Sequence, residues 1–275
     1  MRRLRGESGG PLTGLAGATG VVGAAAITPL LAAPTVRAEQ VSQLVLGETA
    51  ALVGTDGEWC RIRATHDGYE GWAHRGYLRA ADNPTLERWQ SAAWCDGAEL
   101  DAGGAPLTLP LRARVLLHEG GLLLPDGRTA RLVSGGVAAL TAATADARRM
   151  PPEEWAAGHF LGAPYQWGGV TPWGVDCSGL LQTTFAARGL ALPRDAQDQA
   201  GAGAAVVFGE GRPSDVLFFR SESSDRITHV AFLAAGPQLI HSTISRGGVV
   251  REDWHPASEA WDRLGGQLVA VRRFE

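Results

Sequence analysis

Closely spaced turn residues limit how the first half of this chain can fold more than any other feature. Between residues 25 and 79, short apolar stretches end at turn residues such as Gly47 and Gly54-Thr55-Asp56-Gly57. Strands of about five residues between Gly and Asp turns predict a small antiparallel barrel. The same pattern returns between residues 83 and 144, so two tandem barrels of about 60 residues each fit it better than one large sandwich.

The pattern changes at Arg148-Arg149-Met150-Pro151-Pro152, which predicts a linker. After it, residues 153–161 and 178–188 favour helices, and Gly189 ends the second helix. Three strands are then expected, at 216–219, 228–234 and 239–244. Helices before strands within about 125 residues predict an α+β domain. The expected units are a flexible arm or signal segment (1–24), a first barrel (25–82), a second barrel (83–147) and the α+β domain (148–275).

The N-terminal residues permit two interpretations. Three arginines near the start precede an uncharged stretch that ends in Leu31-Ala32-Ala33, as in a secretory signal peptide. Glu7 and several glycines instead favour a flexible arm, and cleavage after Ala33 would remove the opening of the first barrel. We therefore favour a cytoplasmic location over export to the cell envelope. A stable membrane span is less favoured than either, because Thr, Pro and Gly interrupt the apolar run.

The absence of lysine, the net charge and the spacing of the cysteines exclude several functions. The 25 cationic side chains are all arginine. Without lysine there is no P-loop, no Schiff base with pyridoxal phosphate and no Ser–Lys dyad. A net charge of −4 and a pI near 6.0 argue against nucleic acid as the main partner. Cys60, Cys95 and Cys177 form no CxxC pair, so we expect neither a disulfide framework nor a structural zinc site, and Cys60 and Cys95 should be packed thiols.

Cys177 is the candidate nucleophile. Glycines and a proline keep the preceding residues irregular until a helix begins at or just after Cys177. A thiol at a helix N-terminus faces unpaired N–H groups and the positive end of the helix dipole. We therefore expect its pKa to be lowered and the thiolate to be favoured. The alternative is a buried, inert cysteine that packs like a small apolar residue.

His229 and His241 are the candidate base and its orienting partner. The strands that carry them flank a turn at Ala234-Ala235-Gly236-Pro237-Gln238. A turn centred on Gly236 makes the two histidines diagonal neighbours, and a turn centred on Ala235 makes them direct partners. Both registers place the rings on one face of the sheet, as a base and its orienting group require. The alternative is two independent strand histidines.

Several short motifs surround Cys177 and the two histidines. They are Phe160-Leu161-Gly162-Ala163-Pro164-Tyr165-Gln166-Trp167-Gly168-Gly169, Asp176-Cys177-Ser178-Gly179, Leu192-Pro193-Arg194-Asp195, Pro213-Ser214-Asp215-Val216-Leu217-Phe218-Phe219, Thr228-His229-Val230 and Ile240-His241-Ser242. Together they resemble the NlpC family of papain-like bacterial cell-wall peptidases, in the family's order. The resemblance implies that Cys177 is the nucleophile, His229 the base and His241 the residue that orients the base. It also implies that Tyr165 helps to position the substrate or its oxyanion.

The tandem barrels resemble the bacterial SH3-like domains of a subgroup of this family. Family members cleave the bond between the γ-carboxyl of D-glutamate and a diamino acid, and the subgroup acts on released murein peptides with a free N-terminal L-alanine. The resemblance implies that Asp176, Ser178 and Tyr69 contact the amine end of the peptide. Asp176 could equally cap the helix, and Tyr69 could equally belong to the barrel core. Val41 stands where the subgroup often has an acidic residue, with Glu39 two positions away.

The expected fold is an α+β papain-like C-terminal domain, with N-terminal helices packed on an antiparallel sheet, preceded by two small all-β SH3-like barrels. The expected activity is that of a cysteine peptidase on L-Ala-γ-D-Glu-diamino acid peptides. We expect no cofactor and no metal, because no further Cys or His stands near Cys177 at metal spacing. Two rivals stay open: an inactive protein that binds cell-wall peptide, and another amidase or acyltransferase on the same scaffold.

Overall fold

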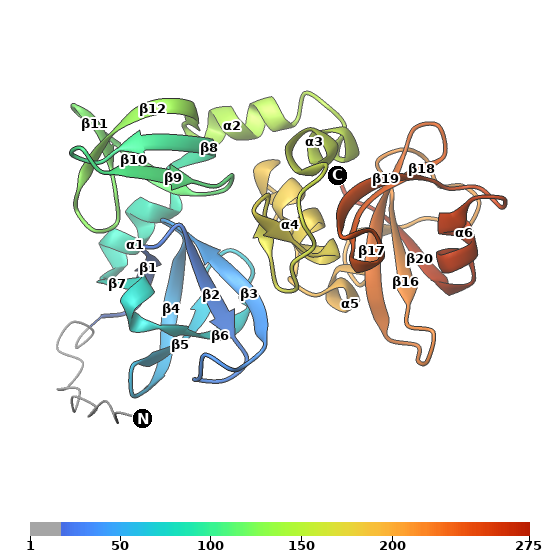
Figure 1. Cartoon of the computed structure of the whole chain (residues 1–275), viewed down its shortest axis with the longest axis horizontal. Helices are drawn as coiled ribbons and strands as arrows, with labels where there is room; N and C mark the ends of the chain where they lie inside the picture. Colours follow the sequence, from blue (N-terminus) through green and yellow to red (C-terminus); the bar gives the residue numbers. More distant parts are fainter. Residues whose placement is uncertain (1–17) are drawn as a thin grey trace, which may run out of the picture.

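The chain folds into two β-rich parts beside an α+β part. The computed structural model describes residues 18–275, so the N-terminal arginines behind the signal interpretation lie outside the described residues. In Figure 1 the two β-rich parts lie on one side, and helix α2 (Leu140–Ala147) leads from the second of them toward the α+β part. Across residues 18–275, no helix is long and apolar enough to cross a membrane.

Seven antiparallel strands form the first sheet, in the spatial order β3-β2-β6-β5-β4-β1-β7. Its buried core includes Leu30, Leu44 and Ile62. The expected start of this barrel was residue 25, whereas β1 begins at Gly20 and pairs with both β4 and β7. The strands are β1 (Gly20–Gly23), β2 (Ile27–Leu31), β3 (Gln40–Val45), β4 (Thr49–Asp56), β5 (Trp59–Ala64), β6 (Glu70–His74) and β7 (Leu78–Ala81).

Helix α1 (Asn83–Gln90) joins the first sheet to the second, in a region where the sequence pattern indicated only strands. Asp82 caps the helix through its side chain. Trp89 packs in a buried cluster with Val22 of the first sheet and Leu116 of the second. So short a helix depends on tertiary packing for its stability, and turn patterns in the sequence do not reveal such packing.

Five strands form the second sheet, in the order β10-β11-β12-β8-β9, and β10 also pairs with β8. At an irregularity in β12, Gly135 has a φ of 84°, and a Cβ there would collide with the carbonyl oxygen of Gly97. Cys95 in this sheet and Cys60 in the first are buried free thiols, as expected. The strands are β8 (Ala93–Asp101), β9 (Pro106–Leu109), β10 (Arg114–His118), β11 (Gly121–Leu123) and β12 (Thr129–Ala138).

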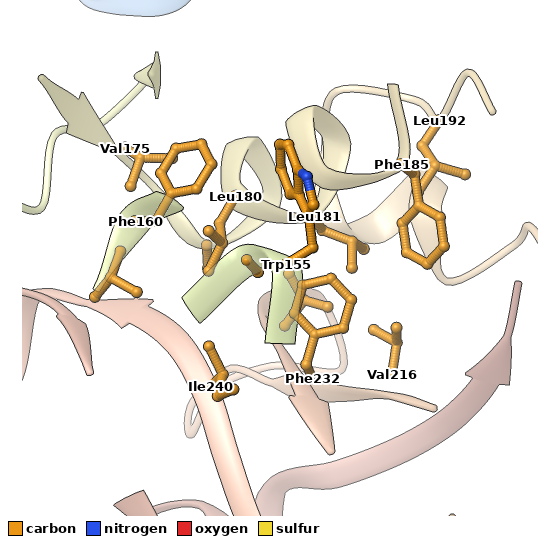
Figure 2. Packing of buried hydrophobic residues seen from close by; sticks show 14 of the residues in the cluster. Trp155, Phe160, Val175, Leu180, Leu181, Phe185, Leu192, Val216, Phe232 and Ile240 are labelled. Carbon is orange, nitrogen blue, oxygen red and sulfur yellow. The ribbon is translucent and has the colours of Figure 1, made fainter. Parts of the chain in front are cut away.

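The C-terminal part is an α+β domain, which confirms the expected fold class. Helices α3 (Pro152–Phe160) and α4 (Cys177–Ala187) pack on a six-stranded antiparallel sheet in the order β15-β20-β16-β17-β18-β19. Figure 2 shows Leu180 and Leu181 of α4 lying above Phe232 and Ile240 of the sheet. The remaining elements are β13 (Val170–Thr171), β14 (Gly174–Val175), α5 (Ala196–Gln199), β15 (Ala204–Ala205), β16 (Val216–Arg220), β17 (Ile227–Ala234), β18 (Gln238–Thr243), β19 (Gly248–Asp253), α6 (Glu259–Leu264) and β20 (Leu268–Arg273).

The first barrel docks on the α+β domain through strand β3. Gln40 Nε2 donates a hydrogen bond to the carbonyl of Trp167 at 2.9 Å, and Gln43 Oε1 accepts one from the amide of Val170 at 3.1 Å. These bonds hold the barrel against the loop that precedes α4. The barrel is therefore placed to form one wall of whatever site α4 carries.

Arg112 connects all three parts of the chain from a buried position. Its guanidinium donates to Glu48 Oε1 of the first barrel at 2.6 Å and to Thr183 Oγ1 of α4 at 3.0 Å. Arg112 itself precedes β10 and is 1% exposed. Leaving either charge buried without its partner would strongly destabilise the protein. An arrangement of the barrels and α4 that separates Arg112 from Glu48 is therefore disfavoured.

Candidate active site

Cys177 is the first residue of α4, and Asp176 caps that helix. Asp176 Oδ1 accepts a hydrogen bond from the amide of Gly179 at 2.7 Å, and its Oδ2 accepts one from the amide of Gly168 at 2.8 Å. Gly168 has a φ of 74°, a conformation that favours glycine. The Asp176 carboxylate thus fixes both the loop before the nucleophile and the first turn of α4.

The sulfur of Cys177 lies against strand β17. The pairing of β17 with β18 stops short of residues 228–230, so the backbone there is left to contact the thiol. Cys177 Sγ donates to the Thr228 carbonyl across 3.9 Å and accepts from the amide of Val230. Cys177 therefore contacts the backbone on both sides of His229.

Burial raises the pKa of the Cys177 thiol to about 12, and the neighbouring Asp176 carboxylate acts in the same direction. This corrects the expectation of a lowered pKa. Cys177 is only 8% exposed, and the hydration that its thiolate would lose outweighs the favourable helix N-terminus. The ligand-free protein therefore carries a protonated thiol at neutral pH.

His229 and His241 form a hydrogen-bonded pair, with 2.8 Å between His229 Nε2 and His241 Nδ1. Strand register explains the pair, because Ala234 lies opposite Gln238 and the turn is centred on Gly236. This is the first of the two expected registers, in which the histidines are diagonal neighbours. His241 engages Nε2 of His229, so Nδ1 is the ring nitrogen of His229 that this hydrogen bond leaves unoccupied.

The imidazole of His229 is partly buried and, at neutral pH, electrically neutral. Burial lowers its pKa well below the ordinary 6.5, and His241 and Arg263 lower it further. On its other side, His241 Nε2 lies 2.8 Å from Glu252 Oε2. The motifs quoted from the sequence did not include Glu252, because nothing local distinguishes it from the other acidic residues near the C-terminus.

A groove with a cavity volume of about 410 Å³ opens onto Cys177. Residues of the first barrel form part of its lining, and the α+β domain supplies the rest. Of the expected site residues, Cys177, Asp176, Ser178 and Tyr69 line it, as do Glu39 and Val41. Further lining residues that the sequence did not single out for a role are Trp167, Arg194, Asp195, Ala196, Gln197, Arg226, Ile227 and Thr228.

Arg194 engages the two residues that flank Cys177. Its guanidinium donates to Asp176 Oδ1 at 3.1 Å and Oδ2 at 2.6 Å, and to Ser178 Oγ at 2.8 Å. Its Nε also donates to Ser42 Oγ of the first barrel at 3.2 Å. Asp176 and Ser178 thus lie at the groove but already have buried partners. The capping alternative for Asp176 is therefore realised, whatever else this carboxylate contacts.

Tyr69 reaches from the first barrel to the α+β domain. Its hydroxyl donates to Asp195, with distances of 3.4 Å to Oδ1 and 3.3 Å to Oδ2. The side chain is partly exposed and lines the groove, so it is not a barrel core residue. Burial raises the pKa of the Asp195 carboxyl, and Arg194 acts against that effect.

Tyr165 is not among the residues that line the groove, but it lies near Cys177 and Asp176. Its pKa is raised by burial and further by the nearby Cys177 and Asp176 groups. The phenol is therefore neutral, and a neutral phenol can donate a hydrogen bond. Among the described residues, no group of three His, Cys, Asp or Glu side chains is arranged to hold a metal ion.

The motif sequence and the fold both match known proteins. Residues 162–262 match the NlpC/P60 family, and residues 28–79 match the bacterial SH3 domain. Residues 162–262 of this chain form a domain of the NlpC/P60 family. An NlpC/P60 family protein from Bacillus cereus ATCC 10987, of known crystal structure, superimposes with a TM-score of 0.73 over 93% of this chain and 99% of that one. At 19% identity, that similarity establishes the shared fold.

Two curated relatives resemble the NlpC/P60 domain in sequence. The γ-D-glutamyl-L-lysine dipeptidyl-peptidase of Bacillus subtilis is 44% identical over 84 residues, which is 30% of this chain and 28% of that protein. A probable endopeptidase of Escherichia coli, NlpC, is 39% identical over 87 residues, which is 31% of this chain and 56% of that protein. The matched part is thus less than two thirds of either relative.

Two residues at the groove of this NlpC/P60 domain lie within a motif seen in the sequence, although the sequence indicated no role for them. Arg194 and Asp195 belong to Leu192-Pro193-Arg194-Asp195, and the structure places both at the groove. A signal was present, since a buried helix-capping Asp needs a partner and Arg194 follows it by 18 residues. Nothing in the sequence pointed to the contact between Asp195 and Tyr69, because it joins residues 126 positions apart.

Proposed function

We propose that this protein is a cysteine peptidase that hydrolyses the γ-D-glutamyl–diamino acid bond of short murein peptides with a free N-terminal L-alanine. One observation carries the proposal. The thiol of Cys177 lies on a groove and contacts the backbone on both sides of His229, whose imidazole is hydrogen-bonded to His241. A nucleophile, a base and a group that orients the base are the minimum for nucleophilic acyl transfer.

The chemistry proceeds without a cofactor. Cys177 Sγ attacks the γ-glutamyl carbonyl carbon while its proton passes to Nδ1 of His229. We assign the stabilisation of the oxyanion to amide N–H groups at the start of α4 and to the neutral phenol of Tyr165. His229 then gives the proton to the leaving amine, and a thioester remains. Water then adds to the thioester, and His229 takes a proton from that water. The sulfur of Cys177 leaves and receives this proton from His229, which regenerates the thiol.

The acidic end of the groove supports selection of a free amine. Asp195 and Glu39 present carboxylates to the groove, and Tyr69 positions Asp195 from the barrel side. A substrate ammonium would form charge-assisted hydrogen bonds there. Asp176 and Ser178 act on this end of the groove indirectly, through their hydrogen bonds with Arg194. Because Val41 is not acidic, we assign the role of the subgroup's acidic residue to Glu39. Residues of the first barrel close this end of the groove. A peptide whose alanine is still attached to glycan would therefore not fit.

A cation in the groove lining fits the rest of the peptide. Arg226 lines the groove beside Ile227 and Thr228. The α-carboxylate of D-glutamate remains free in a γ-linked peptide and needs a positive partner. Arg226 is the residue we assign to it, because a guanidinium matches the two oxygens of a carboxylate.

The decisive experiment is the hydrolysis of synthetic L-Ala-γ-D-Glu-meso-diaminopimelate and its L-lysine counterpart, with mass detection of released L-Ala-γ-D-Glu. We expect release by the parent protein, none by Cys177→Ala, and full activity in Cys60→Ala, whose thiol lies in the barrel core away from the groove. N-acetylation of the alanine should abolish turnover. Equal cleavage of the acetylated peptide would contradict the free-amine assignment, and hydrolysis by Cys177→Ala would contradict the peptidase itself.

The two rival functions predict other results in the same assay. An inactive peptide-binding protein would bind the tripeptide and release no dipeptide. An acyltransferase would transfer the acyl group to an added amine faster than to water. The hydrogen-bonded histidine pair beside Cys177 favours catalysis, because a binding protein has no need of an oriented base.

A further inference from the structure

Glu252 lies on β19, directly beyond the histidine pair. Its Oε2 is 2.8 Å from His241 Nε2, and His241 Nδ1 is 2.8 Å from His229 Nε2. Strands β18 and β19 pair with His241 opposite Val250, so Glu252 is a diagonal neighbour of His241 on the same face. His241 is fully buried, and both of its ring nitrogens have protein partners.

We propose that Glu252 is a positioning residue that sets the proton arrangement of the histidine pair, so that His229 presents an unprotonated Nδ1 to Cys177. The inference rests on the proposed peptidase function and adds a fourth residue to the three that carry it. His241 orients the ring of His229, and Glu252 determines which ring nitrogen of His241 carries the proton.

The carboxylate dictates the direction of each hydrogen bond in the chain. An ionised carboxylate only accepts, so His241 carries its proton on Nε2. A neutral imidazole with a proton on Nε2 has a bare Nδ1, which only accepts, so His229 carries its own proton on Nε2. Nδ1 of His229 is then bare and can take the thiol proton. The reversed arrangement would place a proton on that nitrogen and block the transfer.

Two arginines keep Glu252 ionised and hold its orientation. Arg263 Nη2 donates to Oε1 at 2.6 Å and to Oε2 at 2.7 Å, and Arg246 Nε donates to Oε1 at 2.9 Å. Burial raises the pKa of Glu252, but the hydrogen bonds from His241, Arg263 and Arg246 outweigh burial and hold the pKa far below its ordinary value. Glu252 is therefore a constant hydrogen-bond acceptor throughout the neutral pH range.

Glu252 also acts on the charge that develops during the reaction. Burial, His241 and Arg263 all lower the pKa of His229, and the Glu252 carboxylate acts against them. When His229 becomes an imidazolium, the Glu252 carboxylate beyond His241 stabilises its positive charge electrostatically, and no proton passes along the chain of hydrogen bonds. A fixed negative group aimed at a developing positive charge lowers the barrier without reorganising.

A purely structural role for Glu252 predicts a different outcome. Glu252 joins Arg246 and Arg263 in an ion-pair cluster, which Glu259 extends by contacting Arg246. If Glu252 served only this cluster, its removal would lower stability and leave the turnover of the folded protein unchanged. Glu259 is exposed, so Glu259→Gln is a matched control that perturbs the cluster and leaves the bond to His241 in place.

The test combines imidazole ¹⁵N–¹H NMR with kinetics on Glu252→Leu, Glu252→Gln and Glu259→Gln. In the parent, both histidines should carry their proton on Nε2 at neutral pH. Glu252→Leu should lose kcat by roughly 10- to 100-fold with little change in KM, and the acid limb of its pH profile should move to lower pH. Glu252→Gln keeps an acceptor oxygen and should lose less. Glu259→Gln should match the parent.

Two results would overturn the inference: a proton on Nδ1 of either histidine in the parent at neutral pH, or a Glu252→Leu variant as active as Glu259→Gln. Should Glu252→Leu not fold, the parent spectrum and the Glu252→Gln kinetics decide instead. The NMR measurement needs no substrate. If the parent hydrolyses no peptide, the proposed function fails, while the proton arrangement can still be read and judged by itself.

Discussion

Arg194 forms a buried, two-point ion pair with Asp176, the residue directly before Cys177. The contact places a guanidinium from one loop of the α+β domain on the carboxylate that caps the nucleophile helix. A bidentate pair of this kind fixes geometry as well as charge. Arg194 therefore balances the negative charge of Asp176 in the ligand-free protein, before any substrate ammonium is bound.

Arg194→Met should strongly destabilise the protein. It leaves the Asp176 carboxylate buried without its cation, a change that costs about 3–5 kcal/mol in other proteins. Urea unfolding at neutral pH measures the loss. Arg131→Met is the control, because Arg131 forms an exposed pair with Asp101 at 3.5 Å and should change stability little. A loss for Arg194→Met no larger than for Arg131→Met would contradict the structural role of the pair.

Tyr69→Phe should weaken substrate binding and leave kcat nearly unchanged. The substitution removes the hydroxyl that donates to Asp195 but keeps the ring that lines the groove. At 3.3 Å this hydrogen bond is long, so we expect it to contribute about 0.5–1.5 kcal/mol and KM to rise by about 2- to 10-fold. Steady-state kinetics on the free tripeptide measures it, with Tyr77→Phe, an exposed tyrosine of the same barrel, as the control. An unchanged KM would remove Tyr69 from the binding site.

Activity should persist to lower pH than an ordinary histidine base allows. The base works unprotonated, and burial lowers the pKa of His229 well below 6.5, so kcat/KM should fall only as the pH drops well below that value. At high pH no gain from thiolate formation is expected near pH 9, because the pKa of Cys177 is about 12. A pH profile of kcat/KM measures both limbs. An acid limb at 6.5 or above would contradict the neutral, buried base.

A solvent isotope effect offers a further check on the same point. The thiol is protonated in the ligand-free protein, so its proton moves as the sulfur attacks. We therefore expect kcat/KM to be larger in water than in deuterium oxide. A preformed thiolate–imidazolium pair has already completed that transfer and would give a ratio near or below unity.

Gly179→Ala and Gly158→Ala should have opposite effects, although both glycines are helical. A Cβ on Gly179 would collide with the carbonyl oxygen of Gly169 and push α4 away from the loop before Cys177. We expect a loss of about 1–3 kcal/mol and of most activity. Gly158 in α3 has open space around it, so alanine should stabilise by about 0.5–1 kcal/mol. Thermal unfolding and the peptide assay measure both, and similar behaviour of the two variants would contradict the close packing of α4.

Local signals in the sequence were sufficient for the elements that carry the chemistry. The expected helix at 178–188 is observed as Cys177–Ala187, because an Asp cap and the stop at Gly189 are encoded in neighbouring residues. The turn between the histidine strands left two registers open. The one centred on Gly236 is found, and Gly236 there takes the φ of 73° that glycine favours.

The amino-acid sequence alone indicated the two β-rich parts, the α+β domain, the helix at Cys177 and the face shared by His229 and His241, since turn chemistry and side-chain periodicity act over a few residues. Only the tertiary structure decided that Cys177 is protonated, that Arg194 takes up Asp176, and that Glu252 stands behind His241. Burial and the pairing of charges from different elements determine these properties, and both exist only once the α+β domain has folded.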